Sequence, residues 1–591
     1  MISVMIKGGS FLTNTLPPED IFTPEDINVN QKLIANIVTE FLKGEIEPQI
    51  KELEAKAEGL MESLLKKSAG MGWLGIDIPK EFGGFGLDIS TSMIVTEKMA
   101  VGGPFAIANF THTVFGTFPI LYFGNGEQKR RYLPDLAKGK KIGAFALTEP
   151  DMGSDALNVK TVAQLSKDEK DYVLNGQKQF ISNAGFADVF ITYAKVDGEK
   201  FTAFIMDRDS KGLSFGKEED KMGILGASTR SVTMENVKVP AQNLLFQLGE
   251  GHVVAFNTLN LGRFKLGAAS VGMAKLAFED SIRYAKNRVQ FGQPISNFGL
   301  IKEKIGEMAI RIFVGESIVY RTSKLLEDVL KNIKTSEESR FELGSRIEEY
   351  AIECSISKIY ASEMLGFVAD EAVQIHGGYG FMKDYPVERY YRDARIYRIF
   401  GGTNEINRLL LLRRLMREAA EDRFNLIGVL EKIAIEPLNT SGTFYYQKNE
   451  ADLFHFLRDA KRITLYLLGL VCRAYPNDFG SHQELIRMIS NMIIEVFAVE
   501  SIVLRTQKID KKLGEEKSMI TKAISMVYIL EASMRIERWA KLIVGVISEG
   551  QMLQNNLLTI KTLTQFVPID SIAIRRQIAD FMLRANRYFV A

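Results

Sequence analysis

The sequence has few of the residues and patterns that mark several common protein classes. Its 591 residues include only two cysteines, Cys354 and Cys472. Two cysteines cannot form a disulfide framework, and they fit a reducing compartment such as the cytoplasm. The five histidines are spread along the chain without the spacing of metal ligands, so we expect no metal site.

Long apolar runs and an excess of one charge are also missing. No stretch reaches the uninterrupted apolar length of a membrane span, and the start, MISVMIKGGSFLTNT, lacks the apolar run of a signal peptide. The 74 Lys and Arg residues nearly balance the 73 Asp and Glu residues, and no basic face is visible, which argues against nucleic acid as a partner. The rest is the composition of an ordinary globular protein, long enough for three or four domain-sized units.

The hydrophobic periodicity changes along the chain. Apolar residues three and four positions apart predict a helical domain over residues 1–145. Short alternating runs predict a β domain, barrel or sandwich, over 146–250, where DYVLNGQKQFISNAG carries an Asn-Gly step typical of a hairpin turn. Helical patterns return over 251–418 and again over 430–591.

The two later helical regions share an internal repeat. IGEMAIRIFVGESIVYRTSK (305–324) aligns without gaps with ISNMIIEVFAVESIVLRTQK (489–508), and eleven of the twenty positions are identical. A chance recurrence of helical periodicity would preserve the apolar spacing but not the Glu-Ser and Arg-Thr pairs. We infer that residues 430–591 are a degenerate copy of the preceding bundle, which packs where another subunit's helical domain would otherwise lie.

The stretch RIYRIFGGTNEINRLLLL (395–412) contains two adjacent glycines, Gly401 and Gly402. It is predicted to be an extended segment, a hinge, and then a helix capped by Thr403 or Asn404. A Gly-Gly step lets another group approach the backbone closely. Taken alone, the pattern also fits a loop before a core helix.

Six stretches in order give the chain a more specific likeness. They are AFALTEPDMGSDA (144–156), KQFISNAGFAD (178–188), LNLGRFKLGAA (259–269), NRVQFGQPI (287–295), VQIHGGYGF (373–381) and RDARIYRIFGGTNEINR (392–408). Together they resemble the acyl-CoA dehydrogenase family, most closely its very-long-chain-type members with a helical C-terminal extension.

The resemblance implies an α+β multidomain fold. An N-terminal helical domain, a middle β domain and a C-terminal four-helix bundle would be followed by a helical extension. It also implies an FAD-dependent oxidoreductase that dehydrogenates a long-chain acyl-CoA between the α and β carbons in fatty acid β-oxidation. An electron-transferring flavoprotein would accept the electrons, and the extension leaves a peripheral membrane contact open.

By the same resemblance, the first motifs hold the flavin. Backbone near Leu147 and Thr148 would contact the flavin ring, and Ser154 would touch both flavin and acyl-CoA. Phe180 stands where the family usually has tryptophan, and keeps an aromatic face for the ring without the indole donor. Ser182 would hydrogen-bond flavin N5, the hydride-accepting atom.

A second group would reach the FAD of a neighbouring subunit, which implies a homodimer at least. Arg288 matches the arginine that meets the pyrophosphate, because its planar fork pairs with phosphate oxygens. It belongs to a group with Gln290 and Phe291, and the companion loop contributes Gln374, Gly377 and Gly378.

The start of the last helix completes the sites implied by the resemblance. Thr403 and Glu405 would contact FAD at the helix N-terminus. Arg263 would line the acyl-CoA entrance, with Phe400, Gly401 and Gly402 beside the substrate. The Gly401 N–H would donate to the thioester carbonyl, as in an oxyanion hole.

The general base of the reaction is missing from both positions where the family carries it. Most members have a glutamate where this chain has Gly401, and a minority have it where this chain has Gly262. Three explanations stay open: an engineered change, a natural loss that leaves a catalytically silent acyl-CoA- and FAD-binding protein, or a base from elsewhere. Glu405, one helical turn onward, is a candidate substitute.

Overall fold

The protein was analysed as a computed structural model, which describes residues 6–331, 339–421, 423, 425–435, 450–476, 478–565 and 568–590. The N-terminal part is helical, and polar caps fix where its main helices begin. Asn28 and Gln31 form a reciprocal capping box on α1, and Asn125 and Gln128 do the same on α7. The helices are α1 (Val29–Phe41), α2 (Ile50–Glu54), α3 (Leu60–Gly70), α4 (Ile89–Met99), α5 (Pro104–Phe110), α6 (Phe118–Phe123) and α7 (Gly126–Ala137).

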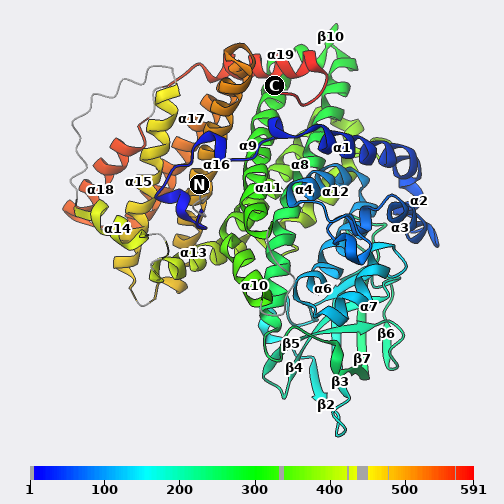
Figure 1. Ribbon diagram of the computed structural model, residues 1–591. Helices are drawn as coiled ribbons and strands as arrows, with labels where there is room; N and C mark the ends of the chain where they lie inside the picture. The colour runs from blue at the N-terminus through cyan, green and yellow to red at the C-terminus, as the bar shows by residue number, and fades with distance from the viewer. Residues whose placement is uncertain are drawn as a thin grey trace.

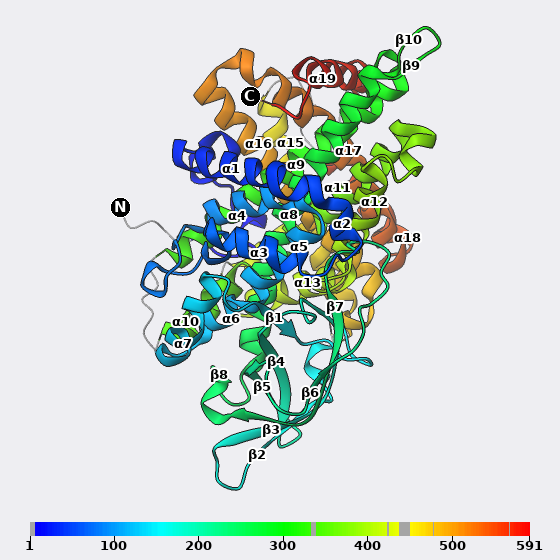
Figure 2. The ribbon, with the colours of Figure 1, turned by 90° about the vertical axis from the view of Figure 1, so that its right-hand side faces the viewer.

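A mixed β-sheet forms the middle of the chain and projects below the helices (Figures 1 and 2). Its strand order is β6-β7-β3-β2-β4-β5-β8, and β1 pairs in parallel with β4. The strands are β1 (Gly143–Ala146), β2 (Val162–Leu165), β3 (Asp171–Ser182), β4 (Val189–Val196), β5 (Lys200–Asp207), β6 (Leu213–Phe215), β7 (Thr229–Pro240) and β8 (Leu244–Leu245).

The hairpin predicted at Asn175-Gly176 is wrong. Strand β3 runs straight through this step, and the pairing with β7 shifts register between Leu174 and Gly176. Asn175 bonds across to Asn236 on β7, so the step makes a bulge instead of a turn. Pairing with β2 on one side and β7 on the other holds the strand extended.

The third part is a bundle of long helices around α8 (Gly251–Asn287), α9 (Gly299–Leu330), α11 (Ala351–His376) and α13 (Asn404–Ala420). Helix α11 ends at His376 and is followed by Gly377 as its C-cap, whose φ of 60° suits a residue without a Cβ. Shorter elements are α10 (Ser339–Glu349), α12 (Val387–Ala394) and the hairpin of β9 (Val289–Gln290) and β10 (Gln293–Pro294). Together with the helical extension described below, this arrangement confirms the predicted fold class.

The segment before the two glycines is not extended, contrary to the prediction. Residues Arg395–Arg398 form a 3-10 helix, directly after α12. The helix start is confirmed, because α13 begins at Asn404 and the Thr403 side chain accepts a hydrogen bond from Ile406 N–H.

The C-terminal extension is a second group of helices beside the bundle (Figure 1). It contains α14 (Leu426–Ile435), α15 (Glu450–Ala474), α16 (Gln483–Leu513), α17 (Glu515–Ile547), α18 (Gly550–Leu563) and α19 (Ser571–Ala585). Two helices make most of its contact with the bundle: α16, which packs against α9 and α13, and α19, which packs against α9. Among the described residues, no helix is long and apolar enough to cross a membrane.

The repeated sequences meet each other across the contact between α9 and α16. Arg321 on α9 pairs with Glu500 on α16 at 2.7 Å, and Arg505 on α16 pairs with Glu316 on α9 at 2.7 Å. Each arginine also lies over the phenylalanine of the opposite copy, Arg321 over Phe497 at 4.2 Å and Arg505 over Phe313 at 4.4 Å. Such exchanged contacts are the pattern of a twofold interface between like units.

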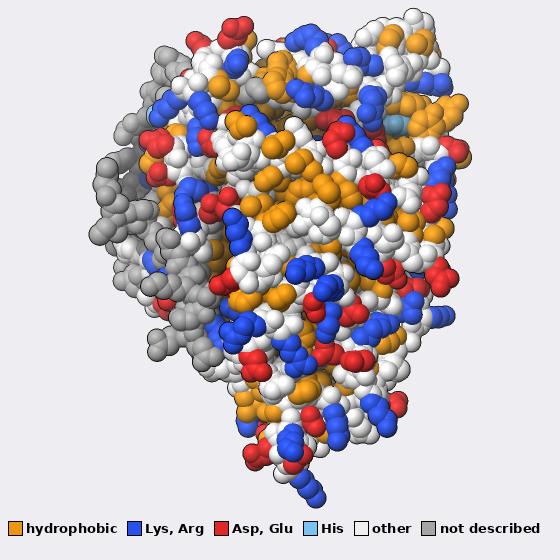
Figure 3. Space-filling model, turned by 45° about the vertical axis from the view of Figure 1, so that its right-hand side comes forward, with side chains coloured by type: hydrophobic (Ala, Val, Ile, Leu, Met, Phe, Trp, Pro, Cys, Tyr) orange, Lys and Arg blue, Asp and Glu red, His pale blue; other side chains and the backbone are white. Residues whose placement is uncertain are grey.

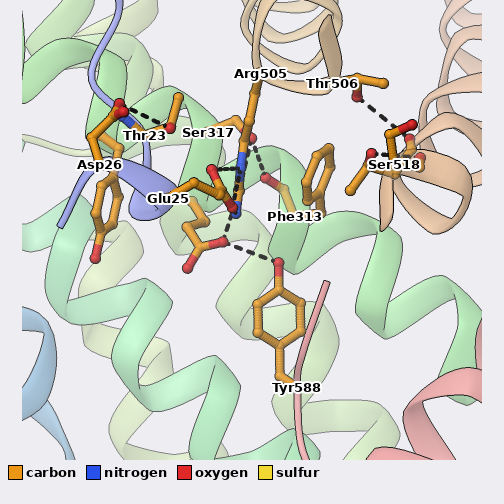
Figure 4. Close-up of polar contacts among 12 residues, drawn as sticks. Thr23, Glu25, Asp26, Phe313, Ser317, Arg505, Thr506, Ser518 and Tyr588 are labelled. Atoms are coloured by element: carbon orange, nitrogen blue, oxygen red, sulfur yellow. Dashed lines mark hydrogen bonds and ion pairs between the residues drawn. The ribbon is translucent and has the colours of Figure 1, made fainter. Parts of the chain in front are cut away.

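The Arg505 pair also ties both ends of the described chain to the bundle. Figure 4 shows its guanidinium between Glu25 and Phe313, and Glu25 lies 2.7 Å from Arg505 Nη2. The Tyr588 hydroxyl donates to Glu316 at 3.1 Å, and Lys275 of α8 also pairs with Glu316. One buried ionic network therefore joins the N-terminal segment, α8, α9, α16 and the C-terminal residues.

Replacing Arg505→Met should destabilise the fold, because the buried Glu316 and the partly buried Glu25 both lose its guanidinium group. Breaking a buried pair on one side costs about 3–5 kcal/mol. The midpoint of denaturant unfolding should fall accordingly, whereas Arg538→Met, which changes an exposed arginine on α17, should shift it little. Equal midpoints for the two variants would contradict the structural role of the network.

Candidate active site

A cavity of about 630 Å³ lies where the helical N-terminal part, the β domain and the bundle meet. Its walls come from α5 and the residues after it, the loop after β1, the end of β3, α8 and the start of α13. The structure brings nine of the sequence-predicted residues to this cavity: Leu147, Thr148, Ser154, Phe180, Ser182, Arg263, Phe400, Gly401 and Gly402.

One wall of the cavity depends on an irregularity near the end of β3. Phe180 has a φ of 59°, unusual for a residue with a side chain, and the pairing with β7 shifts register between Lys178 and Ile181. Its side chain is 61% exposed, so it is not part of the strand core. Strained backbone of this kind often accompanies a functional site.

The loop that contributes Leu147 and Thr148 is anchored by a buried ion pair. Lys178 Nζ lies 2.7 Å from Glu149 Oε1 and donates to the Leu147 carbonyl, and both charged side chains are buried. Burial raises the pKa of Glu149, but Lys178 and hydrogen bonds, including one from Thr161, outweigh burial, so that the pKa lies below its usual value. The loop is therefore fixed before any ligand binds.

The two glycines form the part of the cavity nearest α13. Gly401 and Gly402 have φ values of 69° and 84°, a region that favours glycine. Arg263 Nε donates to the Gly401 carbonyl at 2.9 Å, and Lys358 Nζ donates to the Gly402 carbonyl at 2.8 Å. No acceptor for the Gly401 N–H is found among the described residues.

The two cations that bind the glycine carbonyls, Arg263 and Lys358, are both buried, and neither pairs with a carboxylate in the described parts of the chain. Burial lowers the pKa of Lys358 to about 7, and repulsion from Arg263 adds to the shift. Burial also lowers the pKa of Arg263 to about 10.

Carboxylates are nearly absent from the cavity. Of the described residues that line it, only Asp155 carries one, and this side chain is exposed. Glu405 is exposed and does not line the cavity. A hydrogen bond from its own backbone N–H helps to lower the pKa of Glu405, the opposite of what a general base needs.

The two glycines at the positions where a base was expected from the sequence differ in the space around them. A Cβ on Gly401 would come no closer than 3.1 Å to another atom, the end of the Leu266 side chain. A Cβ on Gly262 would lie 2.9 Å from the ring of Phe115, which would have to move. A side chain at Gly401 therefore meets less steric obstruction, although the φ of 69° strains it, whereas a side chain at Gly262 requires the Phe115 ring to shift.

The second predicted group lies at a different cavity, which shares no lining residue with the first. Its volume is about 480 Å³, and Arg288, Gln290, Gly377 and Gly378 line it. Gln374 and Phe291 do not line it, and Phe291 is 94% exposed. This region lies at the β9–β10 end of the molecule, far from the β-sheet in Figures 1 and 2.

Family profiles cover most of the chain in order. The N-terminal, middle and C-terminal domains of acyl-CoA dehydrogenases match residues 28–140, 144–237 and 249–416, and a further acyl-CoA dehydrogenase C-terminal domain profile matches 459–562. The chain belongs to the acyl-CoA dehydrogenase family. Its members are flavin-dependent oxidoreductases that act on CH–CH bonds.

Individual relatives agree with this assignment. A probable acyl-CoA dehydrogenase of Bacillus subtilis is 41% identical over 99% of this chain and 98% of its own length. The very long-chain specific acyl-CoA dehydrogenase of Macaca fascicularis is 40% identical over 63% of this chain and 57% of its own length. An acyl-CoA dehydrogenase of Bacillus anthracis solved with FAD superposes with a TM-score of 0.96 at 43% identity, over 99% of this chain and 100% of the other.

The residues of the 630 Å³ cavity suit FAD, which the Bacillus anthracis structure contains. The outward face of Phe180 offers a surface for an aromatic ring system, and Ser182 beside it carries a hydroxyl. Leu147 and Thr148 would border the ring, and Ser154 would lie between cofactor and acyl chain. Bound there, FAD supplies the acceptor for a hydride.

Sequence reasoning missed several cavity residues. Ile406, Leu409, Leu410 and Arg413 line the cavity from one face of α13, and their spacing of three and four residues could have revealed them. Lys358 was also missed, since it acts through a backbone carbonyl and no sequence pattern points to such a contact.

Replacing Lys178→Met should weaken both stability and FAD binding, because Glu149 would stay buried without its cation. We expect a loss of about 3–5 kcal/mol in unfolding free energy, as for other broken buried pairs. FAD affinity should fall as the Leu147–Thr148 loop loosens, which reconstitution of the apoprotein followed by flavin fluorescence would measure. Lys167→Met, on an exposed loop, is the matched control. Unchanged FAD affinity in Lys178→Met would show that the pair does not position the loop.

Proposed function

We propose that the chain is the scaffold of an FAD-dependent dehydrogenase for long-chain acyl-CoA thioesters in fatty acid β-oxidation. The observation that carries the proposal is a cavity in which residues from three parts of the chain meet around Gly401, whose N–H has no acceptor in the described parts of the structure. The likeness to very-long-chain enzymes supports the long acyl chain, and the aromatic wall of Phe110, Phe115 and Phe145 offers it an apolar path.

The arrangement suits activation of a carbon acid. The α-proton of a thioester becomes acidic enough only if the carbonyl oxygen is stabilised as negative charge develops on it. We assign this role to the Gly401 N–H, and the N-terminus of α13 and the Arg263 guanidinium add positive potential beside it. The apolar walls exclude water and strengthen these interactions.

A second candidate function is a catalytically silent acyl-CoA-binding flavoprotein. Asp155 carries the only carboxylate among the described residues that line the cavity, and its exposure favours this candidate, because a base in a water-excluded site must lie inside that site. Both candidates share the fold and the cofactor. They differ in whether the site is ready for proton abstraction once a carboxylate is present.

Replacing Gly401→Glu should accelerate flavin reduction by a long-chain acyl-CoA by about 10²–10⁴-fold, the usual contribution of a positioned general base. The new side chain has room, although the φ of 69° costs it about 1–2 kcal/mol. Stopped-flow bleaching of the flavin under anaerobic conditions gives the rate.

Two further variants make this result specific. Gly401→Gln has the shape without the base and should stay slow, and Gly262→Glu must displace Phe115 and should fold less well. A Gly401→Glu protein that binds FAD and acyl-CoA but leaves the flavin oxidised would favour the silent binding protein.

The second cavity supports a homodimer in which each subunit contributes to the other's FAD site. Arg288, Gln290, Gly377 and Gly378 lie together there and would face the partner's cofactor. Nearby apolar side chains are exposed, including Val289 at 53% and Phe381 at 80%. Figure 3 shows hydrophobic side chains at this upper right end of the molecule. An electron-transferring flavoprotein is the proposed electron acceptor, as the family resemblance implies.

Replacing Phe291→Asp should shift the protein toward the monomer and weaken FAD binding, because a charge would stand in the apolar contact. Sedimentation velocity and flavin release measure the two effects together. Leu165→Asp, a 43% exposed residue on β2 in the β domain, is the control and should change neither. A wild-type protein that sediments as a monomer with tightly bound FAD would overturn the shared site.

A further inference from the structure

The cations behind the two glycines are exceptions in this molecule. Nine lysine and arginine side chains are buried in the described parts of the chain, and six of them pair with a carboxylate. The three others are Lys129, Arg263 and Lys358. Two of these three hold successive carbonyls, those of Gly401 and Gly402, at the cavity.

A buried charge without a counter-ion is costly, so such a site attracts an anion strongly. Nearby carboxylates do not meet this need. Glu363 pairs with Arg408 at 2.9 Å, and Glu405 is exposed. The N-terminus of α13 adds partial positive charge on the same side.

The geometry leaves a place for this anion. Arg263 uses Nε for the Gly401 carbonyl and Nη1 for Asn260, and its Nη2 has no acceptor among the described residues. Nη2 lies 3.6 Å from the point where a Cβ on Gly402 would stand. A Cβ on Gly401 would stand in tight contact with the Leu266 side chain, at 3.1 Å, but 3.9 Å from Arg263. The room for a small group therefore lies on the Arg263 side, where Arg263 and both glycines line the cavity.

We propose that the space at Gly401, bounded by Arg263, is a carboxylate-binding site in which a carboxylate not carried by the protein replaces the missing glutamate side chain. Arg263 binds this carboxylate directly, and the positive charge of Lys358, at the Gly402 carbonyl, stabilises it electrostatically. The inference rests on the proposed function, because it places the carboxylate beside the α-carbon of a bound acyl-CoA.

The proton transfer that this site allows is balanced without an oxidant. A carboxylate oxygen takes the α-proton, so that an O–H bond forms as the C–H bond breaks. The C–H electron pair stays on the thioester as an enolate, whose oxygen faces the Gly401 N–H. The step is reversible, and in D₂O it exchanges the α-hydrogen for deuterium.

Such a carboxylate has two sources, a free small acid such as formate or a carboxylate on the acyl chain itself. The test uses the FAD-loaded protein in D₂O and follows deuterium at the α-carbon by mass spectrometry. With a saturated long-chain acyl-CoA, formate should raise exchange about tenfold or more over chloride at equal ionic strength, part of the 10²–10⁴-fold that a general base contributes. With dicarboxylyl-CoA thioesters of several lengths, exchange without formate would identify the chain as the source.

Formate binding provides a readout that does not depend on exchange. Saturable thermal stabilisation by formate, absent with chloride, is expected for a ligand that binds only the folded state. Arg263→Gln and Lys358→Met should each reduce this stabilisation and the exchange. Lys129→Met removes the third buried unpaired cation, on α7, and should leave both intact.

The outcomes separate this inference from the proposed function. If FAD and acyl-CoA bind but neither formate nor a dicarboxylyl-CoA promotes exchange, the carboxylate-binding site is wrong and the dehydrogenase scaffold stands. An equal response of Lys129→Met and Lys358→Met would also overturn the site, because it would show a general effect of buried lysines. If acyl-CoA fails to bind, the proposed function fails and this inference with it.

Discussion

The exchanged arginine pairs between α9 and α16 are the interaction on which the rest of the structure depends. They join two helices 184 positions apart in the repeat, and the Arg505 network adds the N-terminal segment and Tyr588. Helix α16 also touches α13, where Arg408 donates to Asn491 at 2.7 Å and Ser490 donates to the Arg408 carbonyl. Since α13 begins shortly after the two glycines, the extension supports the helix that lines the cavity, while none of its described residues lines the cavity itself.

Much of the fold follows from local sequence patterns, and the incorrect predictions show where contacts with other parts of the chain override those patterns. Helical periodicity predicted the helical regions because amphipathic helices such as α1 bury one face. The Asn-Gly step failed because β2 and β7 pair on both sides of β3, and ladder hydrogen bonds outweigh a turn preference. Residues 395–398 were misjudged for a similar reason, since the preceding helix α12 continues into a tight helical turn.

The sequence predicted a site residue only where the identity of its side chain determines its role. Motif order placed Phe180, Ser182 and Gly401 at one cavity. The contacts of Arg263 and Lys358 could not be predicted, because each cation binds a backbone carbonyl and any residue could supply that carbonyl. The carbonyl lies 138 positions away from Arg263 and 44 positions away from Lys358. The left-handed φ of Phe180 was equally invisible, since it arises from the register shift with β7.

The charges around Gly401 bear on two alternatives: a site that has only lost its base, and a site that now binds a carboxylate from another molecule. A glutamate at 401 would partly offset the charges of Arg263 and Lys358, so a glycine there leaves the cations uncompensated. Unpaired buried charges lower stability, and replacing them by apolar residues is often neutral or stabilising. In a site without further use for a negative group, these cations would serve only to hold the Gly401 and Gly402 carbonyls. Their presence, together with the open space beside Gly401, fits a site that still binds a carboxylate at this position.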